Sequence, residues 1–216
     1  MAKDGPADKL IATKEAWARA GRLLTGRPDP DQSLRLPPGP RLVTNWPVLD
    51  LGVQPHVPTD SWRLVIDGAV ASPVTLDWAA FRALPQAEDV SDIHCVTQWS
   101  RYDNRWQGVR TTVLLDLVRP LPAARHVILH GHDGYTTNVA LEHFAEDDCL
   151  LAHSHDGVPL TREHGGPVRA VIPRYYFWKS AKWIKRIELS AVDKPGFWEV
   201  RGYHNVGDPW QEERYG

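Results

Sequence analysis

Short segments with strand-like patterning constrain this chain more than any other feature of its sequence. The clearest is KWIKRIELS (182–190), which has period-two alternation, and HVILHG (126–131) is a compact apolar run. The segment CLLAHSHDGVPL (149–160) carries an Asp156-Gly157 pair in its middle and predicts a hairpin. Further strands are predicted at 62–68, 90–97, 134–141 and 168–173.

Helices are predicted in fewer places. PVTLDWAAFRAL (73–84) predicts a helix with Thr75 as its N-cap and Asp77 in its first turn. VLLDLV (113–118) predicts a short helix, and residues 8–25 predict a basic amphipathic one. The sum is an α+β fold, a mixed or antiparallel β-rich single domain with short peripheral helices.

A proline-rich stretch divides the chain. RPDPDQSLRLPPGPR (27–41) has the composition of a linker or extended arm. We therefore expect an N-terminal helix and arm over residues 1–35 and one domain over 36–216. The basic helix could lie on a membrane surface, but a helix of this length more often packs on its own domain.

Charge and cysteine content limit the possible functions. The 216 residues carry a formal net charge of −2, so no overall field favours nucleic acid or an anionic membrane. The N-terminal region has no apolar run that predicts a signal or a membrane span. The two cysteines, Cys95 and Cys149, cannot build a disulfide framework. We expect a cytoplasmic protein with reduced thiols.

Three groups of residues could support chemistry. Cys149, His153 and His155 could ligate zinc, although no paired CxxC or HExxH motif accompanies them. Cys95 with a histidine could form the nucleophile of a thiol hydrolase. His94 is adjacent to Cys95, and its side chain is expected on the opposite face of the strand.

The third group lies in GGPVRAVIPRYYFWKSAKWIKRIEL (165–189). His164, Arg169, Ser180 and Lys182 could together form a cationic, hydrogen-bonding cradle for a phosphate or another polyanion. Two glycines at 165 and 166 allow a ligand to approach the backbone closely. A solvent-facing basic strand is the alternative interpretation of the same residues.

The motifs HCVTQWS and EHGGPVRAVIPRYYFWKSAKWIKRIELS, with PGFWEVRGYHNVGDPWQEERY at the end of the chain, resemble the sulfite-oxidase-type molybdopterin domain. The similarity is strongest to its small sulfite-oxidase-like oxidoreductases and extends from about Leu36 to the C-terminus. It implies a molybdenum–molybdopterin cofactor with Cys95 as the thiolate ligand of the metal. A soft thiolate suits a metal that dithiolene sulfurs already bind.

The resemblance also implies cofactor contacts. They would come from residues at matching positions: Asn45, Pro47, Val48, Gly131, His164, Arg169, Ser180, Ala181 and Lys182. His164 and Arg169 would hold pterin and phosphate, and the tripeptide 180–182 would bind through backbone amides and an ammonium group. Tyr203 lies where sulfite oxidases have an active-site tyrosine, which predicts a hydrogen-bond donor to the substrate or to oxygen at the metal.

Departures from the sulfite oxidase pattern affect the expected substrate. Thr44 stands where an arginine would precede the asparagine, and Trp99-Ser100 replaces a basic pair after the cysteine. Arg101 could restore one positive charge. A pocket walled by Trp99, Tyr102, Trp106 and Trp198 would favour a small sulfoxide or N-oxide over sulfite. The run CVTQWS is similar to motifs of bacterial methionine-sulfoxide reductases in the same superfamily.

The implied reaction is a two-electron oxygen-atom transfer. We expect no haem, an electron-transfer partner on a separate protein, and a monomer. A domain that binds the pterin or a phosphate ligand without redox turnover is the alternative from another class, and a zinc or thiol hydrolase is the third.

Overall fold

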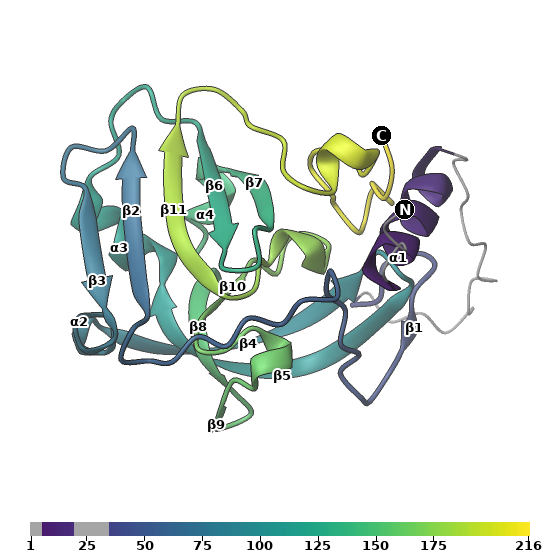
Figure 1. Cartoon of the computed structure of the whole chain (residues 1–216), viewed down its shortest axis with the longest axis horizontal. Coiled ribbons are helices and arrows are strands. Elements are labelled where there is room, and N and C mark those ends of the chain that lie inside the picture. Colours follow the sequence, from purple (N-terminus) through teal and green to yellow (C-terminus); the bar gives the residue numbers. More distant parts are fainter. Residues whose placement is uncertain (1–5, 20–34) are drawn as a thin grey trace, which may run out of the picture.

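The computed structural model describes residues 6–19 and 35–216 of the chain, and the strands of this part form two sheets (Figure 1). The six-stranded sheet has the order β1-β5-β8-β10, with β4 paired to β5 and β9 paired to β8. Its strands are β1 (Arg41–Leu42), β4 (Gln86–Cys95), β5 (Trp99–Arg110), β8 (Leu150–His155), β9 (Val158–Pro159) and β10 (Arg169–Val171).

The five-stranded sheet has the order β3-β2-β11-β6-β7. Its strands are β2 (Arg63–Gly68), β3 (Val74–Asp77), β6 (His126–Gly131), β7 (Thr136–Ala140) and β11 (Ile184–Ser190). The pair β2–β11 is parallel, whereas the other pairs in this sheet are antiparallel. The predicted α+β, β-rich fold class is confirmed.

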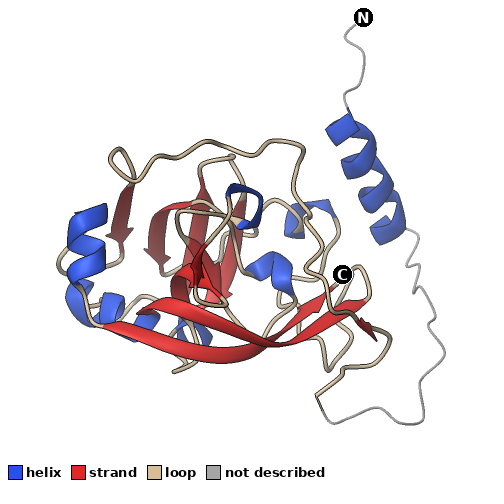
Figure 2. Cartoon of the chain, turned by 90° about the horizontal axis from the view of Figure 1, so that it is seen from below, coloured by secondary structure: helices blue, strands red, loops and turns tan. Residues whose placement is uncertain are grey.

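Helices are short and lie at the edges of the sheets (Figure 2). The α-helices are α1 (Pro6–Arg19), α2 (Trp78–Ala83), α3 (Thr111–Val118) and α4 (Leu141–Phe144). Single 3₁₀ turns are η1 (Arg162–His164), η2 (Phe177–Lys179) and η3 (Glu199–Arg201). Helix α1 stands beside the C-terminal segment, at the end of the molecule opposite α2 and α3 (Figure 1). In the described residues no helix has the length and apolar character that a membrane crossing needs.

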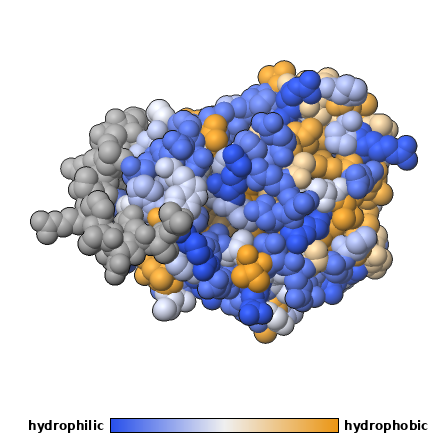
Figure 3. All heavy atoms as spheres, turned by 180° about the vertical axis from the view of Figure 1, so that it is seen from behind, coloured by the Kyte–Doolittle hydropathy of each residue, from blue (hydrophilic) through white to orange (hydrophobic). Residues whose placement is uncertain are grey.

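The core lies between the two sheets and contains three of the ten tryptophans almost completely buried, namely Trp62, Trp106 and Trp183. Their indole rings supply large apolar surfaces, and Trp62 and Trp183 donate their ring N–H to the carbonyl groups of Ile184 and Arg162. Outside this core, hydrophilic residues cover most of the face in Figure 3, with apolar groups gathered toward one end.

The prediction of one helix over 73–84 is wrong for the first half of that segment. Residues Val74–Asp77 form strand β3, which pairs antiparallel with β2, and the helix begins only at Trp78. The cap is Asp77 rather than Thr75, because the Asp77 carboxylate accepts a 2.8 Å hydrogen bond from the Ala80 amide. Val74 and Thr75 are β-branched and favour the strand that the free edge of β2 offers.

Other boundaries differ by a few residues. The hairpin predicted over 149–160 is present as β8 and β9, and Asp156 and Gly157 both have the positive φ of a tight primed turn. The N-terminal helix ends at Arg19, and the predicted extension over 20–25 lies outside the described residues. Strand β5 was not predicted, because its charged residues hide the alternation of its buried positions.

Candidate active site

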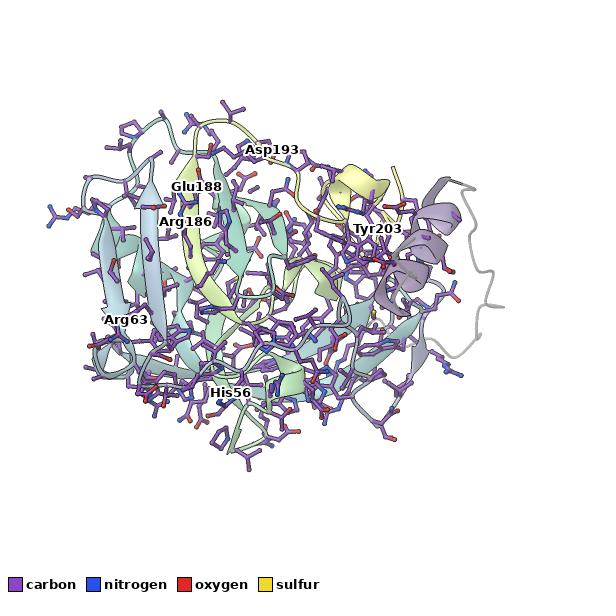
Figure 4. The ribbon with its side chains drawn as sticks, in the orientation of Figure 1. His56, Arg63, Arg186, Glu188, Asp193 and Tyr203 are labelled. Atoms are coloured by element: carbon purple, nitrogen blue, oxygen red, sulfur yellow. The ribbon has the colours of Figure 1, made fainter. Side chains whose placement is uncertain are left out.

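A cavity at the end of β4 brings together side chains that lie far apart in the sequence. Its wall includes Cys95, Arg169, Lys182 and Tyr203. The cavity is also lined by residues 46–51 and by one side chain of helix α1. Figure 4 labels Tyr203 at this end of the molecule, beside α1.

Cys95 is the last residue of β4, at the start of the turn that leads into β5. The residue is 5% exposed, and its Sγ lies 3.1 Å from the Thr97 hydroxyl oxygen. Burial raises the pKa of Cys95, while the hydrogen bond with Thr97 and the charge of Lys14 act in the opposite direction. Burial therefore favours the neutral thiol over the thiolate in the metal-free protein.

His94 does not line this cavity. Its Nδ1 lies 2.9 Å from the Ser100 hydroxyl, and its ring packs edge-on against Trp210. Burial lowers the pKa of His94 to about 4, so the ring is neutral at physiological pH. This agrees with the expectation that adjacent residues of a strand point to opposite faces.

The predicted cationic cradle is assembled on η1, β10 and the residues after η2. The Arg169 guanidinium is buried and donates to the carbonyl oxygens of His164 at 2.9 Å and Ser180 at 2.8 Å. Lys182 donates from Nζ to the Glu163 carbonyl at 2.8 Å, and the His164 ring stacks on Trp46 with 3.8 Å between centroids.

Burial raises the free energy of the charged forms of Arg169 and Lys182. It lowers the pKa of Arg169 to about 9, and burial together with the charge of Arg169 lowers the pKa of Lys182 to about 8. A dianionic group placed between these side chains would offset that cost. The electrostatics of the cluster therefore favour an anionic ligand.

The backbone around the cradle leaves little space for further side chains. Gly165 has φ +103°, and a Cβ there would lie 2.9 Å from the Lys182 Cβ and 3.1 Å from the Arg169 Cβ. The Ser180 hydroxyl accepts a 2.9 Å hydrogen bond from the Ile172 amide. Among the described residues, the backbone N–H groups of Ala181 and Lys182 have no hydrogen-bond partner, so both are available to a ligand.

Of the remaining residues predicted to contact the cofactor, some line the cavity and others do not. Pro47 and Val48 line the cavity, whereas Asn45 is exposed and does not. Gly131 ends β6 outside the lining, and its amide donates to the Tyr135 carbonyl at 2.9 Å. A Cβ at Gly131 would lie 2.8 Å from the Lys182 carbonyl oxygen, so this glycine permits the approach of the 180–182 segment.

Aromatic rings form the wall on the Cys95 side. Trp99, Trp198 and Tyr203 all line the cavity, and the last two stack with 4.9 Å between centroids. The expectation that Tyr102 and Trp106 belong to this wall is wrong. Trp106 is buried beneath the site against Trp46, and Tyr102 lies under the Arg35 guanidinium, outside the lining.

Arg101 does not supply a positive charge to the cavity. Its guanidinium forms a 3.0 Å ion pair with Asp156 and also donates to the side chains of Asn104 and His155. The pairing of β5 with β8 places Arg101 beside the hairpin turn that carries Asp156.

The zinc alternative lacks a ligand set. Within 6–19 and 35–216, no three His, Cys, Asp or Glu side chains come together to hold a metal ion. Cys149 contacts the His143 carbonyl, His153 contacts Arg82, and His155 packs against Trp46. Neither cysteine is in a disulfide bond.

Sequence reasoning missed a number of residues that line the cavity. They are Lys14, Trp46, Asp50, Thr97, Asp133, Tyr135, Phe177 and Trp178. Trp46 and Thr97 lie within two positions of predicted residues, so a wider window around each motif would have found them. No sequence pattern predicts that Lys14 lines the cavity, because only the tertiary packing of α1 brings it there.

The sequence of residues 51–198 matches the family model of the oxidoreductase molybdopterin binding domain. The chain belongs to this family. It is 46% identical over 186 residues to the uncharacterized oxidoreductase YuiH of Bacillus subtilis, covering 86% of this chain and 94% of that protein. The resemblance to the sulfite-oxidase type is thereby confirmed.

More distant relatives match only in part. YedZ1 of Azospira oryzae, provisionally named a protein-methionine-sulfoxide reductase subunit, is 29% identical over 70% of this chain and 58% of its own length. The sulfane dehydrogenase SoxCD of Paracoccus pantotrophus superposes with a TM-score of 0.60, covering 64% of this chain and 40% of that one. At 21% identity this second match shows a shared fold.

The residues present fit the cofactor of this family. The buried Cys95 thiol in the cavity lining suits a soft metal, and the cationic cluster around the buried Arg169 suits a phosphate. Gly165 and the Ala181 and Lys182 amides, which no group in the described part of the chain pairs with, supply the close backbone approach that an anion requires.

Proposed function

We propose that the protein is a molybdenum–molybdopterin oxidoreductase that transfers an oxygen atom to or from a small substrate, with reduction of a sulfoxide or N-oxide as the best-fitting reaction. One observation carries the proposal: the Cys95 thiol, the cationic cradle and an aromatic wall share one cavity. A domain that only stores pterin would not need the thiol at this point. The name of the relative YedZ1 supports a sulfoxide.

Cofactor binding follows from the chemistry of the lining. Arg169, Lys182 and His164 would hold the phosphate together with the amides of Ala181 and Lys182, while Pro47 and Val48 would border the pterin. Cys95 would bind the metal as a thiolate. When bound, the cofactor supplies the two-electron redox chemistry.

The substrate would occupy the space between Cys95 and the aromatic wall. Trp99 and Trp198 present apolar surfaces there, and Tyr203 can donate a hydrogen bond to the substrate oxygen. The pairing of Arg101 with Asp156 removes the charge that a sulfite site would use. Reduction then reads R₂SO + 2e⁻ + 2H⁺ → R₂S + H₂O.

The source of the electrons is also part of the proposal. They would come from a separate electron-transfer protein, and the chain would act as a haem-free monomer in the cytoplasm. The two free cysteines are compatible with a reducing compartment. The absorption spectrum of the purified protein and its elution volume test the haem and the monomer.

The experiment is metal analysis of the full chain made in a molybdenum-replete host, with Cys95→Ser as the matched variant. We expect near-stoichiometric molybdenum in the wild type and loss of metal, or of the thiolate-to-metal absorption, in the variant. Bound zinc without molybdenum would refute the cofactor assignment.

Substrate assays with reduced viologen then separate the reactions. Sulfoxides or N-oxides should oxidise the dye, which also excludes a domain without redox turnover. Saturable oxidation of micromolar sulfite, with sulfoxides inert, would refute the proposed substrate class while leaving the cofactor assignment intact.

A further inference from the structure

Helix α1 places one lysine in the wall of the cavity. Lys14 is only 7% exposed and lines the same space as Cys95 and Tyr203. Its Nζ lies 5.1 Å from the centre of the Trp198 ring. This buried amine shares the cavity with the proposed metal ligand and has no part in the proposed cofactor binding.

The helix is held in place by contacts with the C-terminal segment. Glu15, the next residue of α1, forms a 3.1 Å ion pair with Arg201. Arg201 lies on η3, between Trp198 and Tyr203 in the sequence, and Ile11 packs against the core. The helix therefore covers the substrate side of the cavity, and Figure 4 shows Tyr203 beside it.

Lys14 differs from the cradle cations in what it contacts. Arg169 and Lys182 donate to backbone carbonyl oxygens, whereas Lys14 approaches the face of an indole ring. A ring face attracts the charge but does not satisfy the three N–H donors of an ammonium group. Lys14 thus retains capacity to donate into the cavity.

Acidic groups nearby do not remove that capacity. Burial lowers the pKa of Lys14, and the charges of Cys95 and Asp50 act in the opposite direction. Asp50 also lines the cavity. However, the Asp50 carboxylate already accepts hydrogen bonds from the Gly52 amide at 2.8 Å and from the Gln54 side chain at 2.7 Å.

We propose that Lys14 is the substrate-side cation of this site and selects substrates that carry an anionic group next to an apolar body. The apolar body would lie against Trp198 and Trp99, and the anionic group would meet the ammonium. This inference rests on the proposed function for the identity of the reaction. The charge preference itself belongs to the cavity and can be measured without the cofactor.

The first test uses the full chain produced without molybdenum. Cys95 is alkylated with iodoacetate, which is anionic, or with iodoacetamide, which is neutral and of similar size. The rate with iodoacetate divided by the rate with iodoacetamide does not depend on the fraction of Cys95 that is thiolate. This ratio therefore reports how the charges in the cavity affect an anionic reagent. Lys14→Gln should lower this ratio by about tenfold, the effect expected of one unit charge at close range.

Lys194→Gln is the matched control, because Lys194 is exposed and pairs with Glu188 away from the cavity. It should leave the ratio unchanged, and peptide mapping should show Cys149 unmodified in all folded samples. An equal ratio in wild type and Lys14→Gln would overturn the proposal.

The second test uses the loaded enzyme with methyl phenyl sulfoxide and 4-(methylsulfinyl)benzoate, which differ by one carboxylate. The wild type should prefer the benzoate in kcat/KM, and Lys14→Gln should lose about tenfold on that substrate alone. The same loss on both sulfoxides would overturn the charge role. If neither sulfoxide is reduced, the proposed reaction fails, and the alkylation ratio still decides the role of Lys14.

Discussion

The Lys179–Glu199 ion pair is buried between η2 and η3. Lys179 Nζ lies 2.6 Å from Glu199 Oε1, and both side chains are 1% exposed. Nζ also donates to the Asn138 carbonyl, the Asn138 amide oxygen and the Asn205 carbonyl, at 2.7–3.0 Å. Lys179→Met keeps most of the volume but removes the charge and every one of these donors.

The expected loss in the free energy of unfolding follows from the partners that Glu199 retains in the Lys179→Met variant. Glu199 would keep its hydrogen bonds from Thr137 and Trp178 but would lose the only cation that pairs with it within the described residues. Breaking one partner of a buried pair costs about 3–5 kcal/mol. Because a domain is stable by roughly 5–15 kcal/mol, this change would remove a large fraction of the free energy of unfolding.

Equilibrium urea unfolding of the cofactor-free full chain, followed by tryptophan fluorescence, measures this loss. Lys194→Met is the control, because an exposed ion pair contributes about 0–1 kcal/mol. The double variant Lys179→Met/Glu199→Gln should be less destabilised than Lys179→Met alone, because no buried charge is left unpaired. A loss below about 1 kcal/mol for Lys179→Met, or a double variant that is worse, would refute the reasoning.

Further outcomes are expected at other positions. Tyr203→Phe should slow turnover by about tenfold while molybdenum is retained, because one hydrogen bond to the substrate is lost; unchanged turnover would remove its role. Gly165→Ala should lower the molybdenum content, since the new Cβ would lie 2.9 Å from the Lys182 Cβ, whereas Gly134→Ala, with a similar φ but open space, should not. Burial lowers the pKa of His153 to about 4 from 6.5, so the unfolded chain binds the proton first and stability falls as pH drops from 6.5 towards 4. His153→Gln should flatten that part of the stability curve in urea titrations, and an unaltered slope would contradict the assignment.

Strand patterning and local motifs predicted much of the fold and the grouping of the cationic side chains. The strand predicted at 126–131 has those same bounds, because a compact apolar run bounded by turn residues is determined locally. His164, Arg169 and Lys182 could be grouped from sequence because they lie on adjoining segments. Their meeting with Cys95 could be expected only through the family resemblance.

The substrate side was less predictable, since tertiary pairing decides it. The direction of Arg101 depends on where the hairpin turn places Asp156, and no local pattern reports that distance. Lys14 reaches the cavity through the docking of α1 on the C-terminal segment. Helical periodicity predicts the helix but does not say what the helix packs against.

The side chains that line the cavity come from different parts of the chain, and this division has an evolutionary consequence. Central segments that are continuous with the sheets build the cradle, whereas Lys14, Trp198 and Tyr203 come from regions near the two ends. Under the proposed function, replacements near the ends can alter the side chains that meet the substrate without disturbing the strands that carry Cys95 and Arg169. A family built on this plan can acquire new substrates by exchanging its terminal segments while one cofactor and one scaffold are inherited unchanged.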